Sequence, residues 1–148
     1  MGNRQERRVH KEELFVVLTQ TNTLLASAIR KFTKSKYSHV SLSFNMSCRE
    51  MYSFGRKYYY IPMYGTFKRE DINDRIFAQR DDNMMAIYRL MVTRDEAKQI
   101  RRNIRHIKEV NRGFNVLGLA AAAFNVKLDR DKYYCAEFVH DAIHAETE

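Results

Sequence analysis

Apolar and polar residues alternate along Tyr37–Phe44, and this is the clearest strand pattern in the chain. One side of such a strand is apolar and the other polar: Val40, Leu42 and Phe44 against His39, Ser41 and Ser43. Alternation with a period of two predicts a half-buried β-strand. The pattern places an imidazole at the head of that strand, on its polar side.

Three further segments predict strands. The continuous apolar run Leu14–Leu18 predicts a buried strand, and Ala86–Val92 predicts another. Glu50–Phe54 follows a turn around Cys48 and predicts a strand antiparallel to the one at His39. After Phe54 we expect the chain to leave the sheet and residues 67–83 to be irregular. This part of the chain contains four tyrosines that either line a substrate site or cover an edge of the core: Tyr58, Tyr59, Tyr60 and Tyr64.

Two helices are marked by caps and by apolar spacing. Residues 23–32 predict a helix, capped by Asn22 or Thr21. Thr93 and Glu96 have the spacing of a capping box, in which each side chain binds the other residue's backbone N–H. The second helix has a buried stripe of Ala97, Ile100, Ile104 and Ile107, and Gly113 is expected to end it. Residues 113–126 predict a third helix, rich in small residues.

The last helix begins close to a cysteine. Apolar residues recur downstream at helical spacing: Phe138, Val139, Ala142 and Ile143. Cys135 therefore falls in the first turn, where free N–H groups and the helix dipole favour a thiolate. A buried cysteine that packs as a small apolar side chain is the alternative. A histidine elsewhere in the chain, here His39, is the partner that an activated thiol nucleophile needs.

The chain has 148 residues, which suits a single domain. We expect that domain to span 14–148, after a frayed, charged segment 1–13. The segment lacks the apolar stretch of a signal peptide, and no run is long enough for a membrane helix. These features predict a cytoplasmic protein whose two cysteines are both reduced. The spacing of histidines and cysteines predicts no metal site, and no cofactor motif is present.

Three stretches together resemble a known family: "SHVSLSF" with His39, "EMYSFGRK" from Glu50, and "YYCAEFV" with Cys135. Their order is similar to the circularly permuted, NlpC-like branch of the papain-fold cysteine hydrolases. YiiX-like proteins and lecithin:retinol acyltransferase-like enzymes belong to this branch. In it, histidine precedes cysteine, as it does here. The residue after the cysteine is often serine in these relatives and is Ala136 in this chain.

The resemblance implies an α+β, papain-like fold with a small antiparallel sheet and packed helices. It also implies a thiol hydrolase or acyltransferase that works through an acyl-enzyme. Its substrates would be small peptides, isopeptides, cell-wall-type peptides or acyl lipids. Permuted relatives carry an acidic or polar residue on the strand after the histidine, and this points to Glu50 as the residue that orients His39. Ser41 and Ser53 are the alternatives.

Charge supports a second hypothesis. The net charge is +8, and one helix face carries Lys98, Arg101, Arg102, Arg105 and Lys108. Such a face suits an anionic partner, either an anionic substrate or a lipid surface. The alternative function is therefore a nucleic-acid- or anionic-lipid-binding module on an inactive papain-like fold. No nucleic-acid-binding motif is present, and Glu96 and Glu109 interrupt the basic helix, so the hydrolase is favoured.

Overall fold

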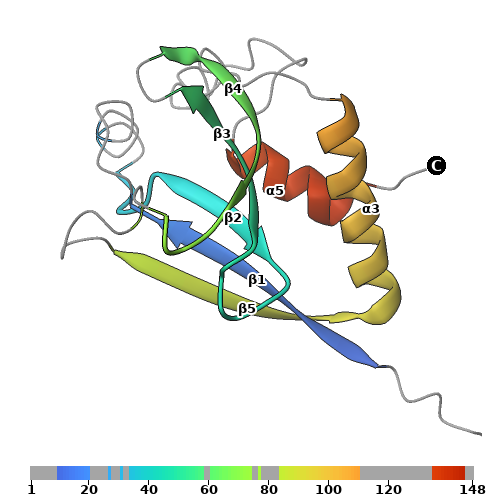
Figure 1. Cartoon of the computed structure of the whole chain (residues 1–148). Helices are drawn as coiled ribbons and strands as arrows, with labels where there is room; N and C mark the ends of the chain where they lie inside the picture. The colour runs from blue at the N-terminus through green and yellow to red at the C-terminus, as the bar shows by residue number, and fades with distance from the viewer. Residues whose placement is uncertain are drawn as a thin grey trace, which may run out of the picture.

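The computed structural model describes residues 10–20, 27, 31, 34–58, 61–74, 77, 84–110 and 135–145, without the side chains of residues 56–58 and 61–65. Figure 1 shows one antiparallel sheet of five strands in the order β4-β3-β2-β1-β5. The strands are β1 Lys11–Thr19, β2 His39–Ser43, β3 Met51–Tyr58, β4 Ile61–Glu70 and β5 Met85–Thr93. Two helices complete the described chain, α3 Arg94–Val110 and α5 Cys135–His144. The predicted α+β class is confirmed.

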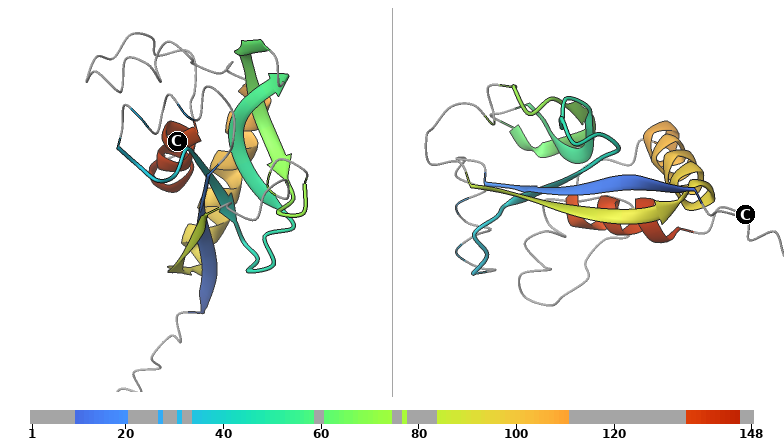
Figure 2. Two further views of the ribbon diagram at one scale, coloured as in Figure 1. Left: turned by 90° about the vertical axis from the view of Figure 1, so that its left-hand side faces the viewer. Right: turned by 90° about the horizontal axis from the view of Figure 1, so that it is seen from below.

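The sheet has two differently covered faces because side chains alternate along each strand. Leu14 of β1, Leu42 of β2 and Phe54 of β3 pack with both helices in the larger core. The opposite face holds a smaller cluster of Phe15, Val17, Cys48 and Met51. Figure 2 shows the twist of the sheet between β5 and the β3–β4 hairpin. The alternation predicted around His39 is confirmed, since Val40, Leu42 and Phe44 all belong to the helix side.

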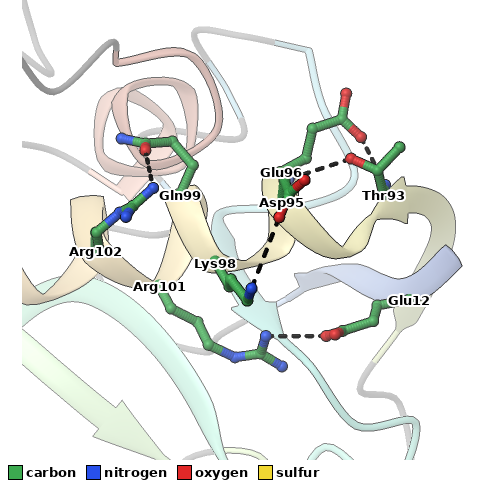
Figure 3. A network of polar contacts seen from close by, with 8 residues as sticks. All are labelled: Glu12, Thr93, Asp95, Glu96, Lys98, Gln99, Arg101 and Arg102. Carbon is green, nitrogen blue, oxygen red and sulfur yellow. Dashed lines mark hydrogen bonds and ion pairs between the residues drawn. The ribbon is translucent and has the colours of Figure 1, made fainter. Parts of the chain in front are cut away.

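Helix α3 begins at the predicted capping box. The Thr93 N–H donates to Glu96 Oε2 at 2.6 Å, and the Glu96 N–H donates to Thr93 Oγ1 at 3.2 Å (Figure 3). Its predicted apolar stripe is buried against the sheet and α5. Asn103 then fixes the end of α5, because its Nδ2 donates to the carbonyls of Ala142 and Ala145 at 3.0 and 2.8 Å.

The β3–β4 hairpin differs from the sequence prediction. We expected the chain to leave the sheet after Phe54 and residues 67–83 to be irregular. Instead β3 continues to Tyr58, and β4 pairs with it from Ile61 to Glu70. Tyrosine, isoleucine and phenylalanine favour strands, and Pro62 is tolerated because β4 lies at the edge of the sheet. The error matters because it left Glu70 outside the predicted sheet.

The ends of the elements can be compared with the other expectations. Strand β1 begins at Lys11, earlier than expected, because Lys11 pairs with Thr93 at the end of β5. The turn around Cys48 joins β2 to β3 as predicted, with Cys48 at a φ of 51°. Of the helix expected at 23–32 only residues 27 and 31 are described, and both are helical. The helix expected at 113–126 lies outside the described residues, as do residues 1–9. In the described part of the chain, no helix is long and apolar enough to cross a membrane.

Candidate active site

Cys135 is the first residue of α5, as the sequence predicted. Burial alone would raise the pKa of its thiol. A hydrogen bond and charge from His39, together with the backbone N–H groups of Val40 and Ala136, outweigh burial and hold the pKa below the ordinary 9.0. Both donors and the imidazolium favour the charged sulfur. The structure therefore brings His39 and Cys135 together and supplies the surroundings of a thiolate.

His39 lies at the head of β2, between this thiol and a carboxylate. Its Nε2 is 3.0 Å from Glu70 Oε2, and only 13% of its side chain and 9% of the Glu70 side chain are exposed. Burial alone would lower the pKa of His39. The charge of Glu70 and hydrogen bonds that His39 donates to Cys135 and Glu70 reverse that effect and raise the pKa of His39 to about 10. Since Nε2 is occupied by Glu70, Nδ1 is the nitrogen left for Cys135.

Glu70 is the last residue of β4 and is the carboxylate that contacts His39. Its Oε2 also accepts a hydrogen bond from Ser41 Oγ at 3.0 Å. Burial would raise the pKa of Glu70, but His39 and the hydroxyl groups of Ser53 and Ser41 lower it below its ordinary 4.5. The buried Ser53 hydroxyl faces the same carboxylate without a hydrogen bond of ordinary geometry. Of the two predicted serine alternatives, Ser41 touches the carboxylate instead of the imidazole.

Glu50 does not occupy the predicted position. Its side chain accepts a hydrogen bond from the Tyr52 hydroxyl and forms an ion pair with Arg69 at 3.2 Å, where 45% of the Glu50 side chain is exposed. Glu50 precedes β3, near the far end of β2 from His39. Glu70 was missed because its segment was predicted to be irregular. A strand prediction for residues 61–70 would have paired Glu70 with Met51 and made it a candidate.

The imidazole of His39 is held from several sides. Phe77 stacks on it with ring centroids 6.5 Å apart, and Thr19 is its directly opposed residue on β1. Gly55 of β3 lies beneath the ring, because a Cβ at that position would be 3.8 Å from His39 Cε1. A ring confined in this way keeps one orientation toward both its partners, which an acid–base residue requires.

Cys48 provides an internal contrast. It is buried at the β2–β3 turn, and its thiol donates to the Met46 carbonyl, at 3.5 Å. Burial raises the pKa of this thiol. Both cysteines are free, so the chain carries one thiol favoured as thiolate and one favoured as neutral thiol.

The basic face of α3 is partly engaged within the molecule (Figure 3). Arg101 donates to Glu12 of β1 at 2.9 Å, and its guanidinium lies 4.1 Å from the ring centroid of Phe44. Lys98 is 3.7 Å from Asp95, and Arg102 donates to Gln99 at 2.6 Å. Arg101 thus links α3 to β1 through Glu12. The basic face of α3 is therefore less available to an external anion than the sequence suggested.

Comparison of the chain with protein-family models, with curated proteins and with solved structures finds no match in any of the three. Among the described residues, no group of three or more histidine, cysteine, aspartate or glutamate side chains is arranged to hold a metal ion.

Proposed function

We propose that this protein is a thiol hydrolase or acyltransferase with Cys135 as nucleophile, His39 as acid–base residue and Glu70 as the residue that orients His39. The observation that carries the proposal is the buried chain of contacts from Glu70 through His39 to Cys135, in which the pKa of the thiol is lowered and that of the imidazole is raised. Matched shifts of this kind in contacting groups are typical of activated nucleophiles.

The resting site would be a thiolate–imidazolium pair. With a pKa of about 10, His39 is protonated near neutral pH, and its proton is the one the thiol has given up. The Cys135 thiolate attacks the acyl carbon, a C–S bond forms, and the carbonyl electrons move to oxygen. When this intermediate collapses, the amine or alkoxide leaves with the proton of His39. The products of this half-reaction are an acyl-enzyme and the free leaving group.

Formation of the acyl-enzyme would also lower the pKa of His39. One cause of its raised pKa is the Cys135 thiolate, and acylation removes that charge. Once the sulfur is bonded to the acyl carbon, the imidazole is a weaker base, so it releases its proton to the departing amine or alkoxide more readily. Neutral His39 next takes a proton from water or an acceptor amine, whose oxygen or nitrogen attacks the acyl carbon and expels the thiolate. Glu70 compensates the imidazolium in both half-reactions.

The fold fits the proposal in its general form. A cysteine at the start of a helix, a histidine on an adjacent antiparallel strand and a third polar group are the parts of a permuted papain-like site. The Cys135 N–H, at the start of α5, is a candidate donor to the oxyanion. Amides of peptides or isopeptides and acyl esters are all compatible with a dyad that attacks an acyl carbon.

Acyl-enzyme trapping tests this function. The protein is mixed with a p-nitrophenyl ester, quenched with acid within the first turnover, and analysed by intact-mass and peptide mass spectrometry. We expect an acyl adduct on Cys135 together with a burst of nitrophenol. Cys135→Ala should lose both, and the matched Cys48→Ala should keep both. Turnover that survives in Cys135→Ala, with no adduct on the thiol of the wild type, would rule the proposal out.

A further inference from the structure

Lys68 of β4 extends beside the imidazole of the proposed active site. A Cβ built on Gly55 would lie 3.6 Å from Lys68 Cδ and 3.8 Å from His39 Cε1, so the lysine stem and the imidazole approach each other over the same glycine. A Cβ at Gly55 would make ordinary van der Waals contact with both, so the lysine stem and the imidazole flank the same position of β3. The ammonium group lies two bonds beyond Cδ, so the lysine stem brings a cation into the neighbourhood of the imidazole.

The neighbours of Lys68 do not neutralise it. Among the described residues, no carboxylate forms an ion pair with its ammonium, and Glu70 on the same face is already bound to His39 and Ser41. Its directly opposed residue on β3 is Ser53, which carries no charge and whose buried hydroxyl faces Glu70. Lys68 is thus a half-buried cation on the His39 side of β4, without an ion-pair partner among the described residues.

The next residue of β4 behaves differently. Arg69 points to the other side of the strand, is 67% exposed and is paired with Glu50. Lys68 and Arg69 carry the same charge at adjacent positions, yet only Lys68 is on the face of His39. This makes Arg69 a matched control for any effect of charge alone.

We infer that Lys68 binds a carboxylate of the acyl donor, which makes an acidic peptide or isopeptide the substrate class of this site, in preference to a neutral acyl ester. The inference rests on the proposed hydrolase function. The attraction is favourable because an ammonium beside a partly dehydrated site interacts with a carboxylate more strongly than it would in water. The net charge of +8 favours the approach of such a substrate.

Two matched thiol reagents test the inference without knowledge of the natural substrate. N-chloroacetylglycine and N-chloroacetylglycinamide carry the same reacting group and differ in a carboxylate a few bonds away. The rate of alkylation at Cys135 is measured for each by mass spectrometry, and the ratio of the two rates is the readout. Using the ratio cancels any change in the thiolate itself.

The wild-type protein should react roughly three- to tenfold faster with the carboxylate reagent at low salt, a preference that salt reduces. Lys68→Met should lose most of this preference, whereas Lys68→Arg and Arg69→Met should retain it. His39 contributes to the ratio in every variant, so the comparison between variants is decisive. An equal ratio in wild type and Lys68→Met overturns the carboxylate subsite while Cys135 remains a nucleophile. A thiol inert to both reagents overturns the proposed function and the subsite together.

Discussion

The two cysteines of this chain show how position changes the chemistry of one side chain. Cys135 begins a helix and contacts an imidazolium and two backbone N–H groups, so its pKa is lowered despite burial. Cys48 lies in a turn under the opposite face of the sheet, and burial without compensating charge raises its pKa. Burial acts in the same direction on both thiols, and the difference lies entirely in the polar groups that meet the sulfur.

The largest expected effect is on reactivity toward a neutral alkylating agent. With iodoacetamide at pH 6–7, Cys135 should be modified at least about a hundredfold faster than Cys48, because only Cys135 has a large thiolate fraction and Cys48 is also buried. Peptide mass spectrometry over a time course gives both rates in one sample. Equal rates would abolish the distinction between the thiols.

A smaller effect should separate the two glutamates. Glu70→Gln removes the charge that most strongly raises the His39 pKa, so the imidazolium and the paired thiolate should both become less populated. We expect Cys135 alkylation near pH 6 to slow by roughly tenfold, since one pKa unit corresponds to a factor of ten. Glu50→Gln, an isosteric change at an exposed ion pair, should alter the rate less than about twofold.

If Glu50→Gln slowed the alkylation of Cys135 more than Glu70→Gln did, Glu50 would again be the candidate for the residue that orients His39. NMR titration of the His39 ring in both variants gives an independent reading, with the His39 pKa falling only in Glu70→Gln. A His39 pKa that stays near 10 in Glu70→Gln would mean that Glu70 does not set the charge of the imidazole.

The sequence predicted the two groups that local patterns specify and missed the one that depends on strand pairing. His39 was found from alternation along β2, and Cys135 from the apolar stripe of α5; each signal is contained within about ten residues. Glu70 lies 31 positions from His39, and only the register of the β3–β4 hairpin brings it close. Because the chain was expected to leave the sheet after Phe54, this register was not predicted, and the family resemblance pointed to Glu50 instead.

The opposite pKa shifts of Cys135 and His39 also make a prediction about stability, the smallest effect considered. A group with a raised folded pKa stabilises the protein fully below its unfolded pKa and loses that contribution as pH rises through the folded value. For His39 the loss runs from 6.5 to about 10. A group with a lowered folded pKa behaves in the opposite way. The contribution of Cys135 therefore grows as pH rises from its folded pKa toward 9.0.

Between pH 7 and 8.5 these two slopes should cancel in the wild type, because the folded pair and the unfolded pair each hold one proton. Cys135→Ala removes one slope and keeps Glu70, the larger charge that raises the His39 pKa. Its free energy of unfolding should then fall with rising pH, by at most about 1.4 kcal/mol per pH unit. The free energy of unfolding of Cys48→Ala should depend on pH as little as that of the wild type, since the raised pKa of Cys48 places its titration above 9.0. Urea unfolding of the three proteins at pH 7.0 and 8.5 measures the slopes. If the free energy of unfolding of Cys135→Ala did not change with pH, His39 would be neutral in the absence of the thiolate. The charge of Cys135, rather than that of Glu70, would then be what keeps His39 protonated.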